Sequence, residues 1–471
     1  MNTDLLERLG ADLGRLSAEA AGRLDRAGEC ATLPDLVPGA TAAFDMGDQR
    51  LDVSLPQIAM THTARGYVDP KYWDEGVNAA RVQYNGNVYR WDSGPRASTQ
   101  GYLGLDAVMN IGAWRLHHQG NFNHDESGGH YQDMQTYMAR SIAPMRSQLL
   151  IGEANTDGSL FDSFGFRGVQ LSSDERMYPE SQRGYAPIVR GIANSNARVQ
   201  IRQNGNIIYE TTVPPGPFEI SDLYPSGYNA DLEVVVTEAD GSVHISKIPY
   251  AAAVNAPRAG STRFSFTVGQ YRHPTQHSTP LLAQATLQHG FTNLLTAYGG
   301  LIAAENYFSG MLGVALNTDY GALGLDVSQS GTHLRTQPDR YGQSVRLSYS
   351  KLMEPTNTSL TLAAYRYSTK GYLDILDAMA LRDLDERGEA GAMSGIVRGR
   401  LQLQVNQNLP QGFGNFDVTG SIQDYWNRGG RDAQLQAGYN NTYRRLSYGV
   451  SVGRQLNVGT NTWDNRGSCC A

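Results

Sequence analysis

One stretch of the sequence comes close to a calcium-binding loop. Residues 153–164 place Asn155, Asp157 and Gly158 at the third, fifth and sixth positions of such a loop. Phe164 stands at the twelfth position, however, where a calcium loop needs a glutamate that binds the ion through both carboxylate oxygens. We therefore interpret this stretch as a polar hairpin turn rather than as a metal site.

Four histidines, His117, His118, His124 and His130, form a second candidate cluster. Imidazole is a common metal ligand, but adjacent residues of a strand point to opposite faces, so His117 and His118 cannot hold one ion together. The chain's three cysteines show no spacing typical of a zinc site. Histidines at a strand end and in a surface loop are the simpler interpretation, and no metal is predicted.

Motifs for covalent catalysis and nucleotide binding do not occur in the sequence. It contains neither a G-x-S-x-G nucleophile elbow nor a G-x-x-x-x-G-K-[ST] phosphate loop. Residues 412–414 begin a dinucleotide-type G-x-G pattern, but Asp417 stands where its third glycine belongs. Carboxylates are numerous, and no spacing singles out a catalytic pair. The sequence therefore predicts neither an enzyme nor a bound cofactor.

The elements that carry these residues share one pattern, an alternation of apolar and polar side chains. In residues 323–328, for example, leucine or valine alternates with glycine, aspartate and serine. Such stretches recur from about residue 79 onward, many of them about ten residues long, as strands that cross a bilayer require. A soluble sandwich would show the same alternation with apolar side chains inside, but it rarely extends so far. We expect a transmembrane β-barrel with its apolar side chains towards lipid.

The composition excludes two other classes of protein. Lysine and arginine number 39 against 46 aspartates and glutamates, so the net charge of −7 provides no basic field to hold nucleic acid. No segment approaches the roughly 18 consecutive apolar residues that a membrane-spanning helix needs. Both observations are compatible with a barrel, because alternating strands have a polar average composition.

Two segments interrupt the barrel pattern. Residues 197–250 have shorter strands, and Asn204-Gly205 and Asp240-Gly241 are typical of two-residue hairpin turns. We interpret this segment as a small β-sandwich inserted into the barrel. Apolar residues at helical spacing in residues 374–387 predict a helix in a loop between two strands.

Several segments of the chain resemble one known family, the fimbrial outer-membrane ushers. They follow the family's order through nearly the whole chain, up to about residue 455. The segments are residues 110–115 (NIGAWR), 131–174, 182–187 (QRGYAP), 199–220 (with QNG, IY and TVPPGPFEI), 238–242 (EADGS) and 365–372 (YRYSTKGY).

The resemblance implies both a fold and a function. The implied fold is all-β, a large transmembrane barrel with an inserted Ig-like sandwich as a plug and part of a mixed α/β periplasmic N-terminal domain. Ushers accept periplasmic chaperone–pilin subunit complexes, promote exchange of the donated strand by β-strand addition, and secrete the growing pilus through the barrel. The implied partners are these complexes, pilin subunits and outer-membrane lipid, without nucleic acid or cofactor.

The plug is expected to occlude the pore at rest and to move aside during secretion, with hinges at residues 193–195 and 251–256. Its charged residues and the helix near residues 374–387 are candidates for a latch, although solvated polar faces are the simpler and favoured explanation of each. An ordinary Ig-like module without a gating role is the alternative. The residues assigned to pore gating are Arg198, Arg202, Glu210, Pro214, Pro215, Gly216, Pro217 and Phe218.

These patterns define the expected domain boundaries. By resemblance, Cys30 is the second cysteine of a disulfide whose partner would lie upstream. The chain is expected to be a usher truncated at both ends, or part of a split one, without a signal peptide. Such a fragment would leave two unpaired barrel edges in hydrocarbon and no working pore. The expected parts are residues 1–65 (partial N-terminal domain), 66–78 (linker), 79–192 (first barrel strands), 193–256 (plug), 257–456 (further barrel strands) and 457–471 (aberrant tail).

Two other functions compete with the usher interpretation. A general porin or a plugged nutrient transporter would carry an N-terminal plug or none, rather than an inserted one. A soluble β-sandwich adhesin would turn its apolar faces inward and would dissolve without detergent.

Overall fold

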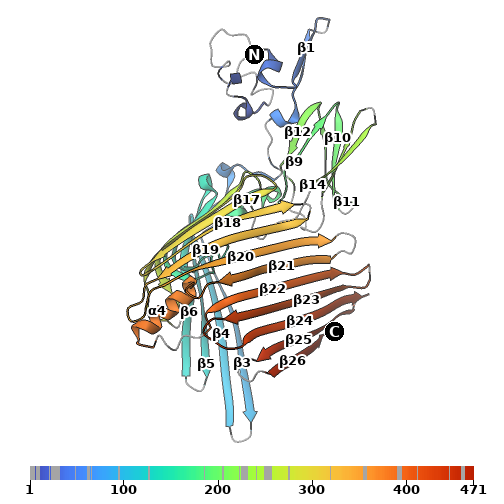
Figure 1. Ribbon diagram of the computed structural model, residues 1–471. Coiled ribbons are helices and arrows are strands. Elements are labelled where there is room, and N and C mark those ends of the chain that lie inside the picture. Colours follow the sequence, from blue (N-terminus) through green and yellow to red (C-terminus); the bar gives the residue numbers. More distant parts are fainter. Residues whose placement is uncertain are drawn as a thin grey trace. The chain divides into compact units, whose positions relative to one another are not determined.

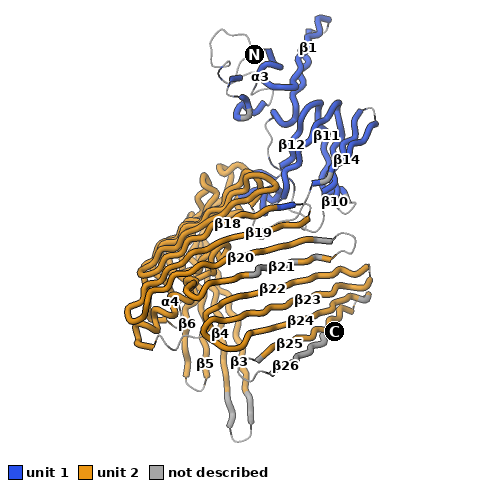
Figure 2. The backbone as a smooth tube through the Cα atoms, viewed as in Figure 1, with its two compact units in different colours: residues 1–67, 178–252, 317–319 blue, residues 68–177, 253–316, 320–471 orange. Residues whose placement is uncertain are grey.

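The computed structural model divides the chain into two compact units, coloured separately in Figure 2. Unit 1 comprises residues 1–67, 178–252 and 317–319, and unit 2 comprises residues 68–177, 253–316 and 320–471. The structure describes residues 6, 11–17, 19–20, 22, 32–47, 49–60, 64, 66–93, 96–125, 128–184, 186–203, 206–221, 223, 232–239, 241–248, 257–273, 276–318, 320–353, 358–389, 395–410, 412–444, 446–457 and 462–470.

Unit 2 is a closed barrel of eighteen described strands (Figure 1). In sheet order the strands run from β15 to β26 and then from β3 to β8, and β8 pairs antiparallel with β15. The strands are β3 (Ala79–Ser93), β4 (Arg96–Ile111), β5 (Trp114–Asp125), β6 (Gly128–Ile142), β7 (Ser147–Asn155), β8 (Gly165–Ser173), β15 (Thr262–Arg272), β16 (Leu281–Gly290), β17 (Leu295–Ala304), β18 (Tyr307–Thr318), β19 (Gly321–Thr332), β20 (Arg340–Met353), β21 (Thr358–Ser368), β22 (Val397–Asn408), β23 (Asn415–Tyr425), β24 (Arg431–Tyr443), β25 (Leu446–Asn457) and β26 (Thr462–Cys470).

Side chains of the barrel wall are buried in the opposite sense to those of a soluble sheet. On β19, Leu323, Leu325 and Val327 are 38%, 46% and 45% exposed, whereas Asp326 and Ser328 are only 4% and 3% exposed. Apolar side chains therefore face outward and polar side chains face inward, as in transmembrane barrels. This arrangement confirms the predicted barrel and contradicts a soluble sandwich for unit 2.

Strand β26 is a correction to the sequence-based expectation. It pairs with β25 from Thr462, opposite Asn457, to Cys470, opposite Gly449, and it is the neighbour of β3 in the closed order. The described strands therefore contradict two expectations. Residues 462–470 form a barrel strand instead of an aberrant tail, and the barrel has no pair of unpaired edges among its described strands. Backbone hydrogen bonds define a strand, and they form without the side-chain alternation that this segment lacks.

The two ends of the barrel carry connections of different length. At one end, residues 156–164, 333–339 and 369–396 connect β7 to β8, β19 to β20 and β21 to β22. At the other end, residues 112–113 connect β4 to β5 and residues 319–320 connect β18 to β19. Because hairpin connections alternate between the two ends, the chain leaves β8 and returns to β15 at the end with the short turns.

Unit 1 contains a small sandwich and an N-terminal segment. The sandwich has a four-stranded sheet in the order β11-β10-β13-β14 and a two-stranded sheet of β12 and β9. A separate apolar cluster around Leu6, Leu33 and Leu36 holds the N-terminal segment. The elements are η1 (Leu13–Arg15), α3 (Leu33–Leu36), β1 (Thr41–Asp45), β2 (Arg50–Ser54), η2 (Gln57–Ala59), η6 (Glu180–Gln182), β9 (Val189–Ala193), β10 (Ala197–Gln203), β11 (Asn206–Val213), β12 (Gly216–Ile220), β13 (Leu232–Thr237) and β14 (Val243–Ile248).

The sandwich is buried in the ordinary sense and is larger than the sequence pattern indicated. Val199 and Ile201 of β10 are fully buried, and Arg198 on the opposite face of the strand is exposed. Because β9 pairs with β12, the sandwich begins before residue 193 and includes a strand that the sequence assigned to the barrel. The turn at Asn204-Gly205 and the residue Cys30 lie outside the described residues.

The remaining helical elements are short, apart from the loop helix. No helix among the described residues is long and apolar enough to cross a membrane. The helical elements described in unit 2 are η3 (Pro70–Tyr72), η4 (Ala143–Met145), η5 (Glu175–Met177) and α4 (Ile375–Glu386).

Candidate functional site

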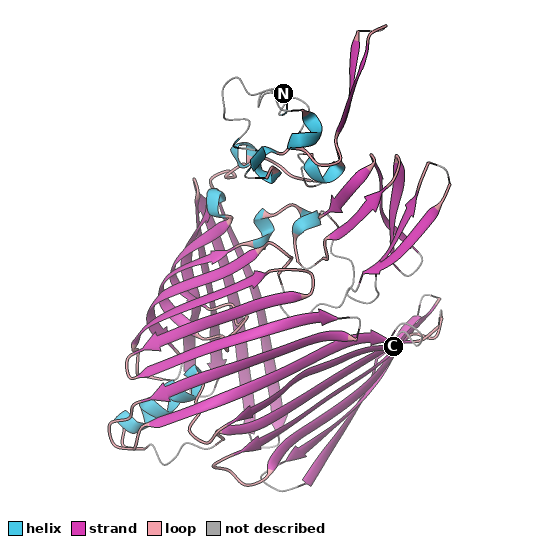
Figure 3. Cartoon of the chain, turned by 45° about the horizontal axis from the view of Figure 1, so that its top comes forward, coloured by secondary structure: helices cyan, strands magenta, loops and turns pink. Residues whose placement is uncertain are grey.

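Helix α4 is packed against the inward face of the barrel wall, at the end that carries the long connections (Figure 3). Asp374 caps the helix by accepting a hydrogen bond from the Asp377 amide at 2.8 Å. Apolar residues of the helix join a cluster with inward-facing residues of β16, β17 and β18. The members from the helix are Ile375, Ala378, Met379 and Leu381, and those from the three strands are Leu282, Ile302, Tyr307 and Met311. Burying each large side chain contributes about 1.5–3 kcal/mol, which holds the helix to the wall.

Two aspartates near the end of α4 bind two turns of the barrel rim. The Asp383 carboxylate accepts hydrogen bonds from the amides of residues 277–278, at 3.0 and 3.2 Å. The Asp385 carboxylate accepts hydrogen bonds from the amides of residues 335–336, at 2.7 and 3.2 Å. Both aspartates are 3% exposed. The helix therefore links the β15–β16 and β19–β20 connections.

Arg382 of α4 binds the turn that lies between these two. Its guanidinium donates a hydrogen bond to the backbone oxygen of Glu305 at 2.6 Å and approaches the Glu305 carboxylate at 3.2 Å. Glu305 belongs to the β17–β18 turn, so one helix end holds three successive hairpins of the barrel together.

The carboxylates at the two ends of α4 have opposite pKa shifts. Burial opposes the charged form of Asp383, but the turn amides and the Arg387 guanidinium outweigh it and lower the pKa. The Thr336 hydroxyl and the turn amides likewise lower the pKa of Asp385. At the N-terminus, burial and the neighbouring Asp374 raise the pKa of Asp377 to about 7. The rim contacts therefore favour charged carboxylates, whereas the buried N-terminus of the helix favours protonated ones.

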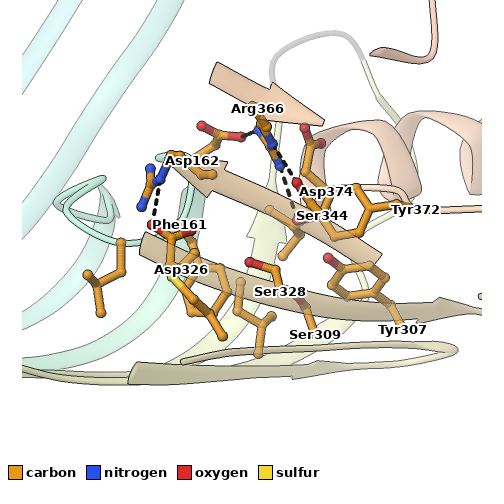
Figure 4. A pocket seen from close by; sticks show the side chains of 15 residues that line it. Phe161, Asp162, Tyr307, Ser309, Asp326, Ser328, Ser344, Arg366, Tyr372 and Asp374 are labelled. Atoms are coloured by element: carbon orange, nitrogen blue, oxygen red, sulfur yellow. Dashed lines mark hydrogen bonds and ion pairs between the residues drawn. The ribbon is translucent and has the colours of Figure 1, made fainter. Parts of the chain in front are cut away.

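A polar pocket lies beside the N-terminus of α4, and Arg366 of β21 is central to it (Figure 4). Its guanidinium donates hydrogen bonds to the hydroxyls of Ser344 and Tyr372, at 3.0 and 3.1 Å, and lies 3.5 Å from the Asp162 carboxylate. Asp162 belongs to the β7–β8 connection and Tyr372 precedes α4. One arginine therefore joins the barrel wall, a rim loop and the helix.

A second ion pair lines the same pocket. Arg346 of β20 lies 2.8 Å from the Asp326 carboxylate of β19, which also accepts a hydrogen bond from the Tyr298 hydroxyl at 3.2 Å. Alternation on these strands placed Asp326 inward, but only the structure identifies its partners. The paired charges position neighbouring strands, and the pocket residues named here include no nucleophile with a general base beside it.

The three charged sandwich residues expected to form a latch lie on the polar side of unit 1's main sheet. The Arg202 guanidinium donates a hydrogen bond to the Gln200 side-chain oxygen at 2.7 Å, and the Gln200 amide donates to the Glu210 carboxylate at 2.6 Å. The structure therefore joins Arg202 to Glu210 through Gln200. Arg198 is exposed on the same face of β10.

The proline-rich segment expected to contribute to gating enters β12. Pro214 and Pro215 precede the strand, and Pro217 lies within it. Phe218 is 1% exposed and lies over Gly191 of β9, where an added Cβ would come within 2.4 Å of the phenylalanine ring. Phe218 is thus a core residue of the sandwich.

The first expected hinge is fixed within unit 1 by a contact that sequence reasoning missed. The Glu238 carboxylate accepts hydrogen bonds from the amides of Asn194 and Ser195, both at 2.9 Å, and from the Ser195 hydroxyl at 2.6 Å. The Asn194 amide and the Ser195 hydroxyl lower the pKa of Glu238. The second expected hinge, residues 251–256, lies outside the described residues.

The residues that first suggested metal binding have other partners. Within the described part of the chain, no group of three or more histidine, cysteine, aspartate or glutamate side chains is placed to hold a metal ion. Glu153 lies 2.6 Å from Arg167 and 3.0 Å from Arg272, in two ion pairs between barrel strands. His118 forms a hydrogen bond with the Tyr131 hydroxyl at 2.6 Å.

Comparison with protein families gives two matches. The family described as outer membrane usher protein matches residues 102–468, and the PapC N-terminal domain matches residues 1–88. The chain is 40% identical over 465 residues to the outer membrane usher protein HtrE of Escherichia coli K12, covering 96% of this chain and 54% of the relative. It is 38% identical over 475 residues to FimD of the same strain, with coverages of 95% and 54%. The chain therefore spans about half the length of the curated relatives it matches.

Two solved structures that contain the usher PapC also match the chain. A cryo-EM structure of the E. coli P pilus tip assembly intermediate PapC-PapD-PapK-PapG matches with a TM-score of 0.64 and 26% identity, covering 100% of this chain and 58% of the matched one. The P pilus usher (PapC) translocation pore matches with a TM-score of 0.55 and 25% identity, covering 83% and 79%.

Proposed function

Because the chain belongs to the outer membrane usher family, we propose that it forms the plugged pore region of a pilus secretion apparatus. The observation that carries this proposal is the barrel of unit 2, with apolar side chains outside and polar ones inside, into whose sequence the sandwich of unit 1 is inserted between β8 and β15. A general porin would not require such an insertion.

The proposed orientation follows from the barrel's connections. Outer-membrane barrels have short periplasmic turns and longer extracellular loops. The end with the short turns, where the chain leaves β8 for the sandwich, would then face the periplasm. The end that carries α4 would face the cell exterior.

The proposed activity is the assembly of subunits without covalent chemistry. Ushers are a transport and assembly family rather than an enzyme family. The PapC relative was solved as a pilus tip assembly intermediate with PapD, PapK and PapG. By analogy, the partners of this chain would be periplasmic chaperone–pilin complexes and pilin subunits, and subunit exchange would proceed by β-strand addition.

The gating proposal assigns residues 197–250 to a plug that limits passage through the pore. We expect the full chain, reconstituted in a planar lipid bilayer, to conduct more ions when this segment is replaced by a short Gly-Ser linker. A control replaces Met46 and Gly47, which are exposed and directly follow β1, and should leave conductance unchanged. Equal conductance with and without residues 197–250 would contradict the plug.

A further inference from the structure

Among the strands that the structure describes, β12 of unit 1 has a neighbour along one edge only. It pairs with β9 alone in a two-stranded sheet, with Phe218 opposite Gly191 and Glu219 opposite Arg190. The backbone groups of successive residues in a strand point to alternate edges. An edge with free N–H and C=O groups is a template for pairing with another extended chain.

The side chain of Gln57 occupies this edge. Its Oε1 accepts a hydrogen bond from the Glu219 amide at 2.8 Å, and its Nε2 donates to the Glu219 backbone oxygen at 3.0 Å. A residue of an added antiparallel strand would bind both backbone groups of one residue in the same way. The Gln57 amide thus stands in for one residue of a strand, although Gln57 belongs to η2 in the N-terminal segment.

Pro217 removes the next donor on the same edge. Backbone groups two residues apart point to the same edge, so the nitrogen of residue 217 lies on the side of the Glu219 amide. A proline has no N–H to donate, and prolines are tolerated at strand edges for this reason. Between them, Pro217 and Gln57 leave β12 without a free donor at positions 217 and 219.

Packing next to these hydrogen bonds fixes the N-terminal segment on β12. Pro56 is buried, and its ring lies where a Cβ on Gly216 would come within 3.0–3.1 Å. Gly216 also has a φ of +116°, which a residue with a side chain rarely adopts. On the other side, the Glu219 carboxylate pairs with Arg190 of β9 at 2.9 Å and holds β12 in register.

We infer that Pro56 and Gln57 cap the outer edge of β12, so that an extended chain can pair with this edge only after the N-terminal segment has left the sandwich. The biological use of the cap rests on the proposed function. A protein that handles subunits during β-strand exchange is exposed to free strands, and an open edge on its own sandwich would compete for them. The N-terminal segment and the sandwich would thereby be coupled, because release of one exposes a binding edge on the other.

Hydrogen exchange of the full chain in detergent tests the cap. We expect Gln57→Ala to raise the exchange rate of the Glu219 amide at least ten-fold, while the amides of Phe218 and Ile220, which point towards β9, keep their rates. Asp52→Asn, a change at an exposed residue of the same segment, should leave all three unchanged. An unaltered Glu219 rate in Gln57→Ala would overturn the inference.

A second variant keeps the test informative if Gln57→Ala unfolds the sandwich. Pro217→Ala introduces an N–H on the same edge, and both polar atoms of the Gln57 amide are already engaged by the Glu219 backbone. We expect the new amide at position 217 to exchange at the rate of an unprotected group while the Glu219 amide stays protected. Protection at position 217 would mean that something other than Gln57 covers the edge, and would contradict the cap. Neither readout depends on ion conductance, so failure of the cap and failure of the pore can be told apart.

Discussion

The barrel and the sandwich are built from the same alternation of apolar and polar residues, yet they bury opposite faces. On β10 of the sandwich, Val199 and Ile201 are fully buried, and Arg198 on the other face of the strand is exposed. On β19 of the barrel, Asp326 is 4% exposed and Leu325 is 46% exposed. A period of two therefore identifies a strand, but the environment on each side of the sheet decides which face is inside.

This comparison predicts that one type of substitution will act differently in the two regions, and the largest effect should be in the sandwich. Ile201→Asp would bury an unpaired charge and should abolish the folded sandwich, which limited proteolysis of residues 186–248 would detect. Leu325→Asp should leave the barrel folded in detergent and cost at most about 2–4 kcal/mol in a bilayer. Equal sensitivity of the two regions in detergent would break the comparison.

The next largest effect should come from the inside of the barrel, where a polar side chain is required. Asp326→Ala removes the partner of Arg346, and a buried pair that loses one member costs about 3–5 kcal/mol. Arg346 is about one-third exposed, so we expect the lower end of this range. Urea unfolding followed by tryptophan fluorescence would measure the loss. The double variant Asp326→Ala/Arg346→Ala should recover part of it, and an additive result would contradict the pair.

A smaller effect is expected at the contact that fixes the start of β10 in the sandwich. Glu238→Gln keeps the shape of the side chain but replaces charged acceptors of the Asn194 and Ser195 amides with a neutral one. We expect a small loss of stability, since hydrogen bonds to charged groups are stronger than those to neutral ones. Faster hydrogen exchange at residues 194–195, with β12 unchanged, would be the signature, and Glu233→Gln on the adjacent β13 is the matched control.

The smallest effect should be a dependence of α4 on pH. The pKa of Asp377 rises from 3.8 to about 7 in the folded protein, so this residue stabilises the docked helix least above pH 7 and the loss develops as pH rises from about 4 to 7. The lowered pKa values of Asp383 and Asp385 act in the other direction, because their contribution is lost only as pH falls below about 4. Exchange of the α4 amides, corrected for the intrinsic pH effect, should be faster at pH 8 than at pH 5.

Asp377→Asn separates this effect from other titrations. The variant carries no charge at either pH, so the difference in α4 exchange between pH 5 and pH 8 should shrink. Asp52→Asn in the N-terminal segment should leave the difference unchanged. A pH dependence of the same size in Asp377→Asn would contradict the assignment.

The sequence predicted what local patterns determine. Alternation identified the barrel strands and the inward position of Asp326, and helical spacing identified α4. The pattern failed for β26, whose pairing with β25 depends on backbone hydrogen bonds rather than on side-chain type. It also failed for β9, which was assigned to the barrel and pairs instead with β12.

The contacts that fix the candidate sites could not be predicted, because they join residues far apart in the chain. Glu238 binds Ser195 across 43 residues, and Gln57 binds Glu219 across 162 residues. Glu238 begins the family-like segment EADGS, but nothing in that segment identifies Ser195 as its partner, and Gln57 belongs to no local motif. Only the fold brings their partners within hydrogen-bond distance.

The central claim, that unit 2 is a barrel with lipid outside and water inside, can be tested directly on β22, where both faces are accessible: Leu401 and Leu403 are each 38% exposed, and Gln402 and Gln404 are exposed on the other face. Spin labels would be placed singly at positions 401 to 406 of the chain in lipid bilayers, after Cys30, Cys469 and Cys470 have been replaced by serine. Collisions with oxygen, which concentrates in lipid, should peak at positions 401, 403 and 405, and collisions with a water-soluble nickel complex should peak at positions 402, 404 and 406. An opposite phase, or no alternation at all, would contradict the account.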